Sequence, residues 1–410
     1  MLSRRNRPYT KMLTPSGSAD DAMLSAALAS AASGWYKEIV VDGMLRIATG
    51  VSHGGGNNAL ILRGTSRWKS GLQAVAGAET ATLLTLGSPT SGYNGYQVIR
   101  DLAFNSAVTK TGGAAISINN AGASAVVEGC TIYNTYDGIR CDGGAIQTQI
   151  RNNDIYLYDT GMRDGIRVDY ESGTPGYGSE TWIVDNAMYG QHGIWANTAA
   201  GVRVLNGDAL HMRGNSVVAF GTNLLIDPSV NRTPENGFYL ITDNIFSDCS
   251  NAANCIVNGA TYQIAKIAFT ANMFCYSNLL GGTSAYGCVV KGQYARGISF
   301  DNCQFSQNAS TGLLISDAAK EVSVANSLVN GNSGYGIDIA SAVVGFRIVN
   351  NRMTNSNMGG GASYTQSHGI RYGGSHSDAI VALNDLRGNG TAGTTGTAPS
   401  TNSYVAGNIS

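Results

Sequence analysis

The sequence predicts an all-β fold, a single-stranded parallel β-helix of about twelve coils preceded by a capping α-helix. Three observations predict it. Strand-like segments recur along the chain every 24 to 33 residues, most of these segments are followed by an asparagine, and 54 glycines accompany only 7 prolines. That composition suits many short strands joined by tight turns.

In one series of segments, a strand of alternating polar and apolar residues is followed by an asparagine and then by a polar and an apolar residue. Identical positions in stacked coils form ladders about 4.8 Å apart, and an asparagine at a turn readily adopts the left-handed conformation. Its amide can then bond to the next asparagine in the stack. The positions assigned to this ladder are Asp101, Gly129, Asn153, Asn186, Asn215, Asn244, Asn272, Asn302, Asn326, Asn351, Asn384 and Asn408.

A second strand recurs out of phase with the first and follows the pattern x-G-I-x-x-x. It reads DGIRCD at 137–142, DGIRVD at 164–169 and HGIWAN at 192–197. Two or three short strands in a period of this length suit one coil of a β-helix, whereas a propeller blade needs about 40 residues. The dense leucine pattern of leucine-rich repeats is absent from the sequence.

The chain is predicted to contain a flexible N-terminal arm over 1–16, a capping helix within 17–36 and one β-helical domain over 37–410. Ser18 is the expected N-cap, with Asp21 three residues later, and the helix is expected to end near Ala32. Its predicted apolar stripe consists of Met23, Ala27, Leu28 and Ala31.

Charge and hydropathy exclude several classes of function. The formal net charge is −1 and no basic stripe is interleaved with aromatic residues, so a nucleic-acid partner is not predicted. No segment has the length of apolar sequence that spans a membrane, and the basic start MLSRRNRPYTK is not followed by the apolar run of a signal peptide. The seven cysteines form no C-x-x-C pair and are predicted to be buried thiols of a protein made in a reducing compartment.

The segment GSADDAMLSAALASAA, followed by the strand EIVVDG, resembles the start of the pectate-lyase-like right-handed parallel β-helix superfamily. The resemblance extends from about Gly17 to Ser410 and implies the fold, in which the helix caps the first coil. Members include lyases, hydrolases, epimerases and proteins without activity, so the resemblance does not fix a reaction. Phage tailspike depolymerases commonly begin in this way. Likeness to them implies a polysaccharide substrate, a homotrimer, a virion-tail or extracellular location, and attachment through the N-terminal arm.

The second series is expected to gather charged side chains on one face of three coils, because strand side chains alternate between core and solvent. Asp169, Glu171 and Asp142 are the predicted catalytic acid and base. Arg140, Arg167, Asp137, Asp164, His192 and Trp195 are predicted to bind substrate, and so are the loop aromatics Tyr170, Tyr177 and Trp182. The expected columns are Ser117–Arg140–Arg167–Trp195, Asn119–Asp142–Asp169–Asn197 and Ala114–Asp137–Asp164–His192.

Like charges one coil apart repel, so Asp142 and Asp169 are expected to be coupled, with the pKa of one raised as suits a general acid. Asp169 and Glu171 would lie roughly 6.5–7 Å apart on one strand, near the lower limit for an inverting glycosidase. Asp142 and Asp169 lie nearer the distance of a retaining enzyme. The sequence leaves both geometries open.

Three other interpretations stay open. The arginines and aspartates are also typical of a surface ion-pair ladder in a non-catalytic glycan-binding or structural β-helix. A polysaccharide lyase acting on a uronate would use Arg140 or Arg167 as neutraliser or base. No cofactor is predicted to be required, and Ca²⁺ on the Asp142/Asp169 column is the one metal prediction, since the histidines lack metal-ligand spacing.

Overall fold

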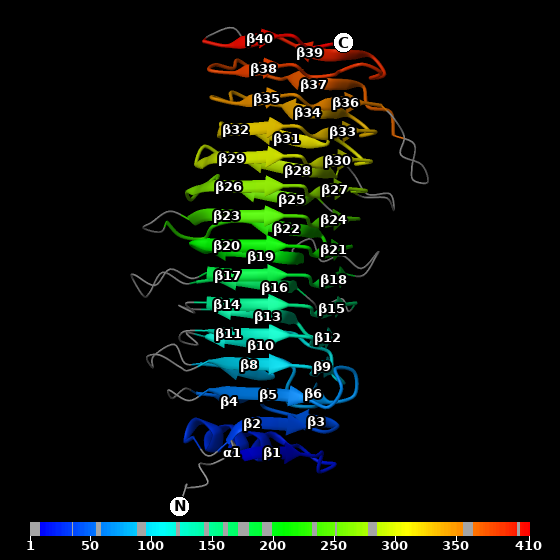
Figure 1. The fold of residues 1–410 in the computed structure, drawn as a ribbon. Helices are drawn as coiled ribbons and strands as arrows, with labels where there is room; N and C mark the ends of the chain where they lie inside the picture. The colour runs from blue at the N-terminus through cyan, green and yellow to red at the C-terminus, as the bar shows by residue number, and fades with distance from the viewer. Residues whose placement is uncertain are drawn as a thin grey trace, which may run out of the picture. The chain divides into compact units, whose positions relative to one another are not determined.

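A computed structural model describes residues 9–34, 36–54, 59–87, 96–119, 124–142, 147–158, 163–170, 180–190, 199–231, 236–250, 252–277, 285–355, 364–399 and 402–410. The chain forms two compact units, Met1–Met188 and Tyr189–Ser410. Each unit is a right-handed parallel β-helix whose coils contribute strands to three parallel sheets, here called A, B and C (Figure 1). The predicted fold class, a right-handed parallel β-helix, is therefore confirmed, whereas the predicted number of coils, the capping role of the helix and the domain boundaries stay predictions.

In the first unit, each coil passes from sheet A to sheet B to sheet C. Sheet A contains β1 (Tyr9–Leu13), β2 (Tyr36–Val41), β5 (Leu60–Gly64), β8 (Gln97–Arg100), β11 (Ala125–Glu128), β14 (Gln147–Arg151) and β17 (Glu180–Val184). Sheet B contains β3 (Met44–Ile47), β6 (Gly71–Ala74), β9 (Ala103–Ser106), β12 (Thr131–Tyr133) and β15 (Asp154–Leu157). Sheet C contains β4 (Val51–His53), β7 (Leu84–Leu86), β10 (Ala114–Asn119), β13 (Asp137–Asp142) and β16 (Asp164–Asp169). A further strand, β18 (Ala187–Gly190), includes the boundary between the units.

The second unit repeats this arrangement. Its sheet A contains β20 (Ala209–Arg213), β23 (Asn236–Thr242), β26 (Ile264–Thr270), β29 (Ala295–Asp301), β32 (Lys320–Ala325), β35 (Arg347–Val349), β38 (Ile380–Ala382) and β40 (Tyr404–Ala406). Its sheet B contains β21 (Ser216–Val218), β24 (Ile245–Ser247), β27 (Met273–Cys275), β30 (Gln304–Ser306), β33 (Leu328–Asn330) and β36 (Arg352–Thr354). Its sheet C contains β19 (Ala200–Asn206), β22 (Thr222–Ile226), β25 (Ala253–Asn258), β28 (Tyr286–Lys291), β31 (Leu313–Ser316), β34 (Tyr335–Ile339), β37 (His368–Tyr372) and β39 (Ala392–Gly396).

The helix α1 (Asp21–Ala32) ends at the predicted residue but begins after the predicted N-cap. Asp20, not Ser18, lies at the N-cap position, and it makes no side-chain capping bond. Its carboxylate instead accepts the backbone N–H groups of Ser16 and Arg46. Leu24 replaces Met23 in the buried stripe, so this face of the helix packs against the first strands of the unit.

The asparagine ladder is present at the turn between sheets A and B. In the second unit, Asn215 Nδ2 donates to Asn244 Oδ1 at 2.8 Å, and Asn244 Nδ2 donates to Asn272 Oδ1 at 2.9 Å. These asparagines also donate hydrogen bonds to main-chain carbonyl groups, so buried polar groups near the turn have partners. The turn between the two strands is thus held by side chains as well as by the sheets.

Four of the predicted ladder positions are wrong by one residue. Asp101, Gly129, Asn302 and Asn326 have positive φ, between 51° and 62°, and lie immediately before the ladder position. For the last two, the inward position belongs to Cys303 and Ser327, and the backbone N–H of Cys303 donates to Ser327 Oγ at 3.1 Å. Asparagine suits both neighbouring positions, for its left-handed conformation at one and its amide at the other, so the residue type alone did not separate them.

A second polar ladder, which was not predicted, runs through the turn between sheets B and C of the second unit. Its members are side-chain amides, all buried except Asn389, that bond to one another at 2.8 to 3.4 Å. No letter pattern repeats at this position of the coil, so the search for sequence repeats did not reveal this ladder. The ladder consists of Asn223, Asn254, Asn308, Asn332, Gln366 and Asn389.

The core between the sheets is filled by aliphatic and aromatic side chains and by thiols. In the second unit, Phe246 stacks on Phe274 with ring centroids 5.3 Å apart, and Phe274 stacks on Phe305 at 5.1 Å. All seven cysteines are buried and free, as predicted, and no disulfide joins Cys249 to Cys255.

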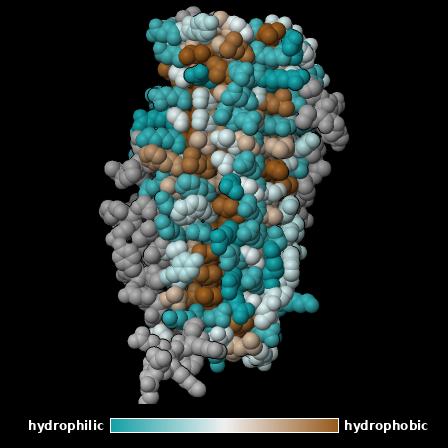
Figure 2. All heavy atoms as spheres, in the orientation of Figure 1, coloured by the Kyte–Doolittle hydropathy of each residue, from teal (hydrophilic) through white to brown (hydrophobic). Residues whose placement is uncertain are grey.

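The outward faces are mixed in polarity. On the face drawn in Figure 2, apolar residues form separate brown patches among teal and white ones. Exposed apolar side chains of sheet A in the second unit include Leu240 in β23 and Ile380 in β38. Within the described ranges, no helix has the length and hydropathy needed to cross a membrane.

Candidate functional site

The charged columns predicted from the sequence form on sheet C of the first unit. Parallel pairing of β10, β13 and β16 brings identical repeat positions into register. The glycine of the repeat is required here, because a Cβ on Gly138 would lie 2.3 Å from the carbonyl oxygen of Gly165 on the next coil. The register partners are Ser117–Arg140–Arg167 and Asn119–Asp142–Asp169.

Each carboxylate in this register is paired with the arginine two residues earlier on its own strand. Arg140 Nε lies 3.1 Å from Asp142 Oδ2, and Arg167 Nη2 donates to Asp169 Oδ2 at 2.6 Å. Ser117 Oγ on the preceding strand donates to Asp142 Oδ2 at 3.3 Å. The Nε atom of Arg167 is buried without a hydrogen-bond acceptor, whereas Nε of Arg140 lies at ion-pair distance from Asp142. We call Arg140, Asp142, Arg167 and Asp169 the Arg–Asp column.

The environments of the two carboxylates differ. Burial raises the pKa of Asp142, and repulsion from Asp169 adds to this effect, although Arg140 and Arg167 oppose it. Burial lowers the pKa of Arg167, but the ion pair with Asp169 outweighs it and leaves that pKa raised. Repulsion from Asp169 thus acts in the expected direction, but burial is the larger cause of the raised pKa of Asp142.

Asp137 and Asp164 are not on the exposed face where the sequence analysis placed them. Their exposed fractions are 2% and 0%. Each lies two residues before an inward-facing isoleucine, Ile139 or Ile166, so strand alternation turns it to the same, inward side. The backbone N–H of Asp164 donates to Asp137 Oδ1 at 3.1 Å. Burial raises the pKa of Asp137 to about 6, and repulsion from Asp164 contributes. Neither residue is placed to bind substrate as predicted.

Tyr170 is also misplaced by the prediction. It follows the outward Asp169 directly, so it points into the core, where it is 2% exposed and its hydroxyl bonds to Thr181. Burial raises the pKa of Tyr170 well above its usual value. Trp182, in contrast, is half-buried in β17, where it is the register partner of Gln149 on sheet A. Glu171, Tyr177, His192 and Trp195 lie outside the described residues.

The sequence analysis continued the Arg140–Arg167 column with Trp195 of the segment HGIWAN, which lies outside the described residues. The structure describes a sheet C strand that was not predicted, β19, which reads AGVRVLN at 200–206. Arg203 in this strand is the register partner of Leu225 in β22. Both segments contain a glycine followed by a branched residue, so the letter pattern alone does not distinguish them.

An aromatic surface lies on sheet B of the same unit. Tyr133 and Tyr156 are register partners on β12 and β15, and Tyr133 is 44% exposed. Tyr158 completes the group, with its ring centroid 5.9 Å from that of Tyr133 and 5.8 Å from that of Tyr156. We call these three residues the tyrosine platform.

A loop that is distant in sequence joins the tyrosine platform. Arg67 forms an ion pair with Asp154 and donates from Nε to Thr131 Oγ1 at 3.3 Å. Its guanidinium carbon lies 5.6 Å from the ring centroid of Trp68, which is 57% exposed. Asp154 and Thr131 lie two residues before Tyr156 and Tyr133 on the same outward face. Sequence analysis missed Arg67 and Trp68, because the segment TSRWKSG carries no repeat signal.

The chemistry available at this unit is that of carboxylates, guanidinium groups and aromatic rings. Two neighbouring carboxylates, each ion-paired with an arginine and one with a raised pKa, are an arrangement suited to acid–base catalysis. Aromatic rings with a polar edge suit stacking against sugar rings. Among the residues that the structure describes, no group of three or more histidine, cysteine, aspartate or glutamate side chains converges to hold a metal ion.

Comparison with known proteins supports the fold but does not assign a family. No family model and no curated protein matches this sequence. Among solved structures, the chain is similar to tailspike protein 3 of bacteriophage CBA120, with a TM-score of 0.61 and 15% identity, over 96% of this chain and 59% of that one. The chain thus spans about three fifths of that tailspike.

Two sugar-processing enzymes are similar to a comparable degree. The A-module of the mannuronan C-5 epimerase AlgE4 from Azotobacter vinelandii matches with a TM-score of 0.55 and 14% identity, over 95% of this chain and 96% of that one. The catalytic unit of a GH87 α-1,3-glucanase from Streptomyces thermodiastaticus matches with a TM-score of 0.55 and 13% identity, over 96% of this chain and 67% of that one. At these identities the likeness establishes the right-handed parallel β-helix fold.

Proposed function

We propose that this protein is a polysaccharide depolymerase that cleaves a bacterial surface or extracellular polysaccharide as a glycoside hydrolase of the phage tailspike type. The observation that carries the proposal is the Arg–Asp column, in which two carboxylates on adjacent strands have different environments. Asp142, whose pKa is raised by burial, would protonate the leaving glycosidic oxygen. Asp169, held by Arg167, would act as the ionised partner, either as nucleophile or as the base for water.

The tyrosine platform supports a sugar polymer as the substrate. Tyr133 and Tyr156 project from neighbouring coils in register, so two aromatic rings lie one coil apart on the same face. A flat ring with a hydroxyl at its edge can cover the apolar face of a pyranose and bond to its rim. The solved structures with this fold include enzymes whose names specify polysaccharide substrates, which agrees with this choice.

A polysaccharide lyase acting on a uronate is the second candidate, and the two arginines favour it. Arg167 keeps a buried Nε atom without an acceptor, so its guanidinium group is not saturated by Asp169. A guanidinium next to the substrate would neutralise the sugar carboxylate during proton abstraction. Ca²⁺ at Asp142 and Asp169 would belong to this second mechanism.

Product analysis separates the candidates. The full chain is incubated with capsular, lipopolysaccharide and exopolysaccharide preparations, and the fragments are analysed by mass spectrometry and ultraviolet absorbance. Hydrolysis gives fragments that have gained one water and do not absorb at the ultraviolet edge. A lyase gives unsaturated fragments that absorb and have gained no water, and chelation of Ca²⁺ by EDTA would abolish its activity. Binding without any fragment would instead indicate a non-catalytic glycan-binding protein and contradict both mechanisms.

The tailspike-type proposal extends to assembly and location. A protein of this kind would be a homotrimer on a virion tail or outside the cell, and residues 1–16 would attach it to the particle. Light scattering of the purified chain measures the oligomer directly, and a monomeric mass at micromolar concentration would contradict the trimer.

A further inference from the structure

A pocket of about 510 Å³ opens on sheet B of the second unit, where the strand β36 meets the coil that follows it. A parallel bridge between Arg352 and Asp385 joins the two coils at this point. A volume of this size falls within the range of ordinary small-molecule sites. The pocket is separate from the Arg–Asp column, which belongs to the first unit. Its lining residues are Arg352, Thr354, Asn355, Asp385, Arg387 and Gly388.

The lining of the pocket has an excess of positive charge, because it contains two arginines and one carboxylate. Arg387 engages both oxygens of that carboxylate: its Nε donates to Asp385 Oδ1 and its Nη2 donates to Asp385 Oδ2, each at 2.9 Å. These bonds are the main cause that lowers the pKa of Asp385 to about 2, so the carboxylate is ionised at neutral pH and committed to Arg387.

Arg352 has no partner of its own within the described ranges. Its side chain is exposed, and it takes part in none of the ion pairs or side-chain hydrogen bonds found there. Its charge acts on Asp385 only from a distance, as a minor cause of the lowered pKa. An arginine carries five N–H donors in a planar fork, so the pocket contains one guanidinium group whose donors are all available.

A second free donor belongs to the side-chain amide of Asn355. Its Oδ1 accepts the backbone N–H of Gln366 at 2.7 Å, which fixes the orientation of the amide. The backbone N–H of Asn355 donates to the carbonyl oxygen of Gly388 at 3.3 Å, so the residue is held from two sides. Nδ2 has no acceptor among the residues that the structure describes. At Gly388 an added Cβ would meet no atom within 4 Å, so this part of the lining leaves room for a ligand.

The free groups of the pocket select an anion. The guanidinium group of Arg352 and Nδ2 of Asn355 only donate hydrogen bonds, and an ionised carboxylate, phosphate or sulfate group accepts them. The planar fork of an arginine matches such a group with two parallel bonds. The positions that flank Arg352 and its bridge partner in this register are Leu328 and Ile409, which cannot neutralise the arginine. A negative group that enters the pocket therefore meets an unpaired positive charge.

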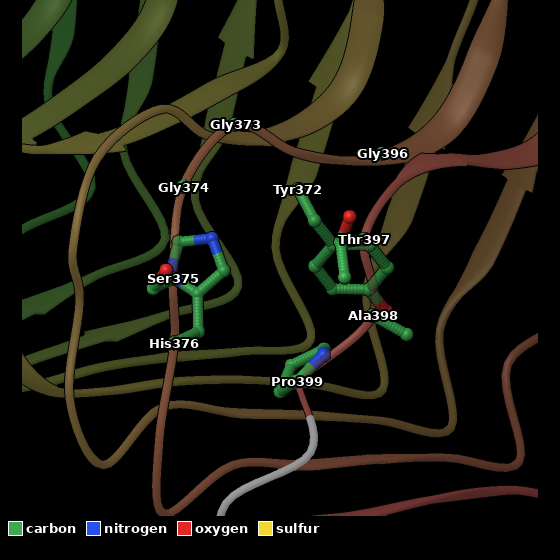
Figure 3. A pocket seen from close by; sticks show the side chains of 9 residues that line it. All are labelled: Tyr372, Gly373, Gly374, Ser375, His376, Gly396, Thr397, Ala398 and Pro399. Atoms are coloured by element: carbon green, nitrogen blue, oxygen red, sulfur yellow. The ribbon is translucent and has the colours of Figure 1, made fainter.

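A second pocket of the same unit provides an uncharged comparison. It lies between the ends of β37 and β39, and Figure 3 shows the residues that line it, among them Tyr372, His376 and Thr397. Its lining contains no arginine, lysine, aspartate or glutamate. The two pockets have similar volumes, about 470 and 510 Å³, so a ligand that enters only the pocket at Arg352 is selected by charge and not by size.

We propose that the pocket at Arg352 binds an acidic sugar unit, whose carboxylate, phosphate or sulfate group accepts hydrogen bonds from the Arg352 guanidinium group and from Asn355 Nδ2. Arg387 holds the Asp385 carboxylate and so prevents it from neutralising Arg352, and the open side at Gly388 accommodates the sugar ring. The choice of a sugar as the carrier of the anion rests on the proposed function. Binding does not require cleavage at the Arg–Asp column, so either proposal can fail without the other.

Saturation-transfer NMR on the full chain tests the site. The anionic probes are the methyl glycosides of glucuronate and galacturonate, a glucose phosphate and a glucose sulfate, and methyl glucoside is the neutral probe. We expect at least one anionic probe to bind with a dissociation constant on the order of millimolar, and the neutral probe to bind at least about tenfold more weakly. Sodium chloride at about 0.5 M should weaken the binding, because salt screens exposed charges.

Acetate and inorganic phosphate, added as competitors, test whether the sugar contributes to binding. At the same concentration as the bound probe they should leave most of it in place, because they lack the contacts of the sugar ring with the pocket. Displacement of most of the probe would show that the anion alone is the ligand and would contradict a sugar site.

Two variants test the assigned roles. Arg352→Gln removes the free guanidinium group and should weaken binding at least about tenfold. Because Arg352 is exposed and has no partner within the described ranges, the melting temperature of this variant should not change. Arg387→Gln releases the Asp385 carboxylate, which would then neutralise Arg352, so binding should fall by a similar factor.

Two further variants are controls. Arg347→Gln removes an exposed arginine of β35 that does not line the pocket, so it changes the net charge equally. Thr397→Val alters the uncharged comparison pocket. Both should bind the anionic probes like the unmodified chain. The proposal is wrong if no anionic probe binds, if anionic and neutral probes bind alike, or if Arg352→Gln binds as tightly as the unmodified chain.

Discussion

Asp142 and Asp169 are register partners on adjacent strands, and each is ion-paired with the arginine two residues earlier on its own strand. The pairing makes two like charges neighbours while giving them different surroundings. Burial raises the pKa of Asp142, which suits the role of general acid. Four predictions follow from this relationship and from the rest of the fold.

Replacing either aspartate by asparagine should abolish most of the polysaccharide cleavage. General acid–base catalysis contributes on the order of 10²–10⁴-fold, so we expect Asp142→Asn and Asp169→Asn each to lower kcat by at least about 100-fold. Fragment release from the substrate found by product screening is the measurement. Asp338→Asn is the matched control, because Asp338 is also partly buried and ion-paired with an arginine, Arg371. An equal loss in this control would assign the effect to folding.

Truncation of the tyrosine platform should weaken substrate binding more than it slows the chemical step. Tyr156→Ala removes a ring that contacts Tyr158, and aromatic contacts contribute about 0.5–1.5 kcal/mol, which corresponds to roughly a two- to twelvefold rise in KM. Tyr156→Phe keeps the ring and should keep most of the affinity. Should the two variants have the same KM, stacking on this residue would play no part in binding.

The buried acid Asp137 should make the folded state less stable as the pH rises. Its pKa is raised from 3.8 to about 6, so the folded chain binds this proton more tightly than the unfolded chain does. The stabilising effect is complete below pH 3.8 and is lost as the pH rises through about 6, which amounts to about 3 kcal/mol.

Asp137→Asn removes this titration. We expect it to raise the free energy of unfolding by about 1–3 kcal/mol at pH 7 and to change it little at pH 4, in urea denaturation at both pH values. Asp243→Asn, at an exposed left-handed turn, controls for the loss of one negative charge. Equal effects of Asp137→Asn at both pH values would show that Asp137 does not titrate in this range.

The asparagine ladder should be sensitive to substitution at the inward position and tolerant at its neighbour. Asn351 is 2% exposed, and its Nδ2 donates to Val324 O and Asn384 Oδ1, both at 3.0 Å. Asn351→Ala would leave buried main-chain groups without hydrogen-bond partners, which should lower the free energy of unfolding by about 2–3 kcal/mol. Asn350 is exposed with a φ of 55°, so Asn350→Gly should change stability by less than about 0.5 kcal/mol. Similar effects of the two variants in thermal unfolding would contradict the inward ladder.

The repeat length and the register of the Arg–Asp column were predictable because they depend only on counting. A coil that returns after 27 residues brings Asp142 over Asp169, as backbone pairing confirms. The burial of Asp137 and Tyr170 was also implicit in strand alternation, since their positions alternate to the side of the strand opposite to the residues of the Arg–Asp column. Asp137 and Asp164 were grouped by charge and Tyr170 with the loop aromatics, and this grouping overrode the alternation and produced the errors at these three residues.

Other features were decided by the tertiary structure alone. Arg67 and Asp154 are separated by 87 positions, and no sequence pattern links them. Whether Asn302 or Cys303 faces inward depends on how the backbone turns between sheets. The sequence by itself determined a stacked solenoid, because its period places apolar residues in line from coil to coil. Only the folded chain decided which polar groups meet, because those contacts depend on where each turn directs its side chains across neighbouring coils.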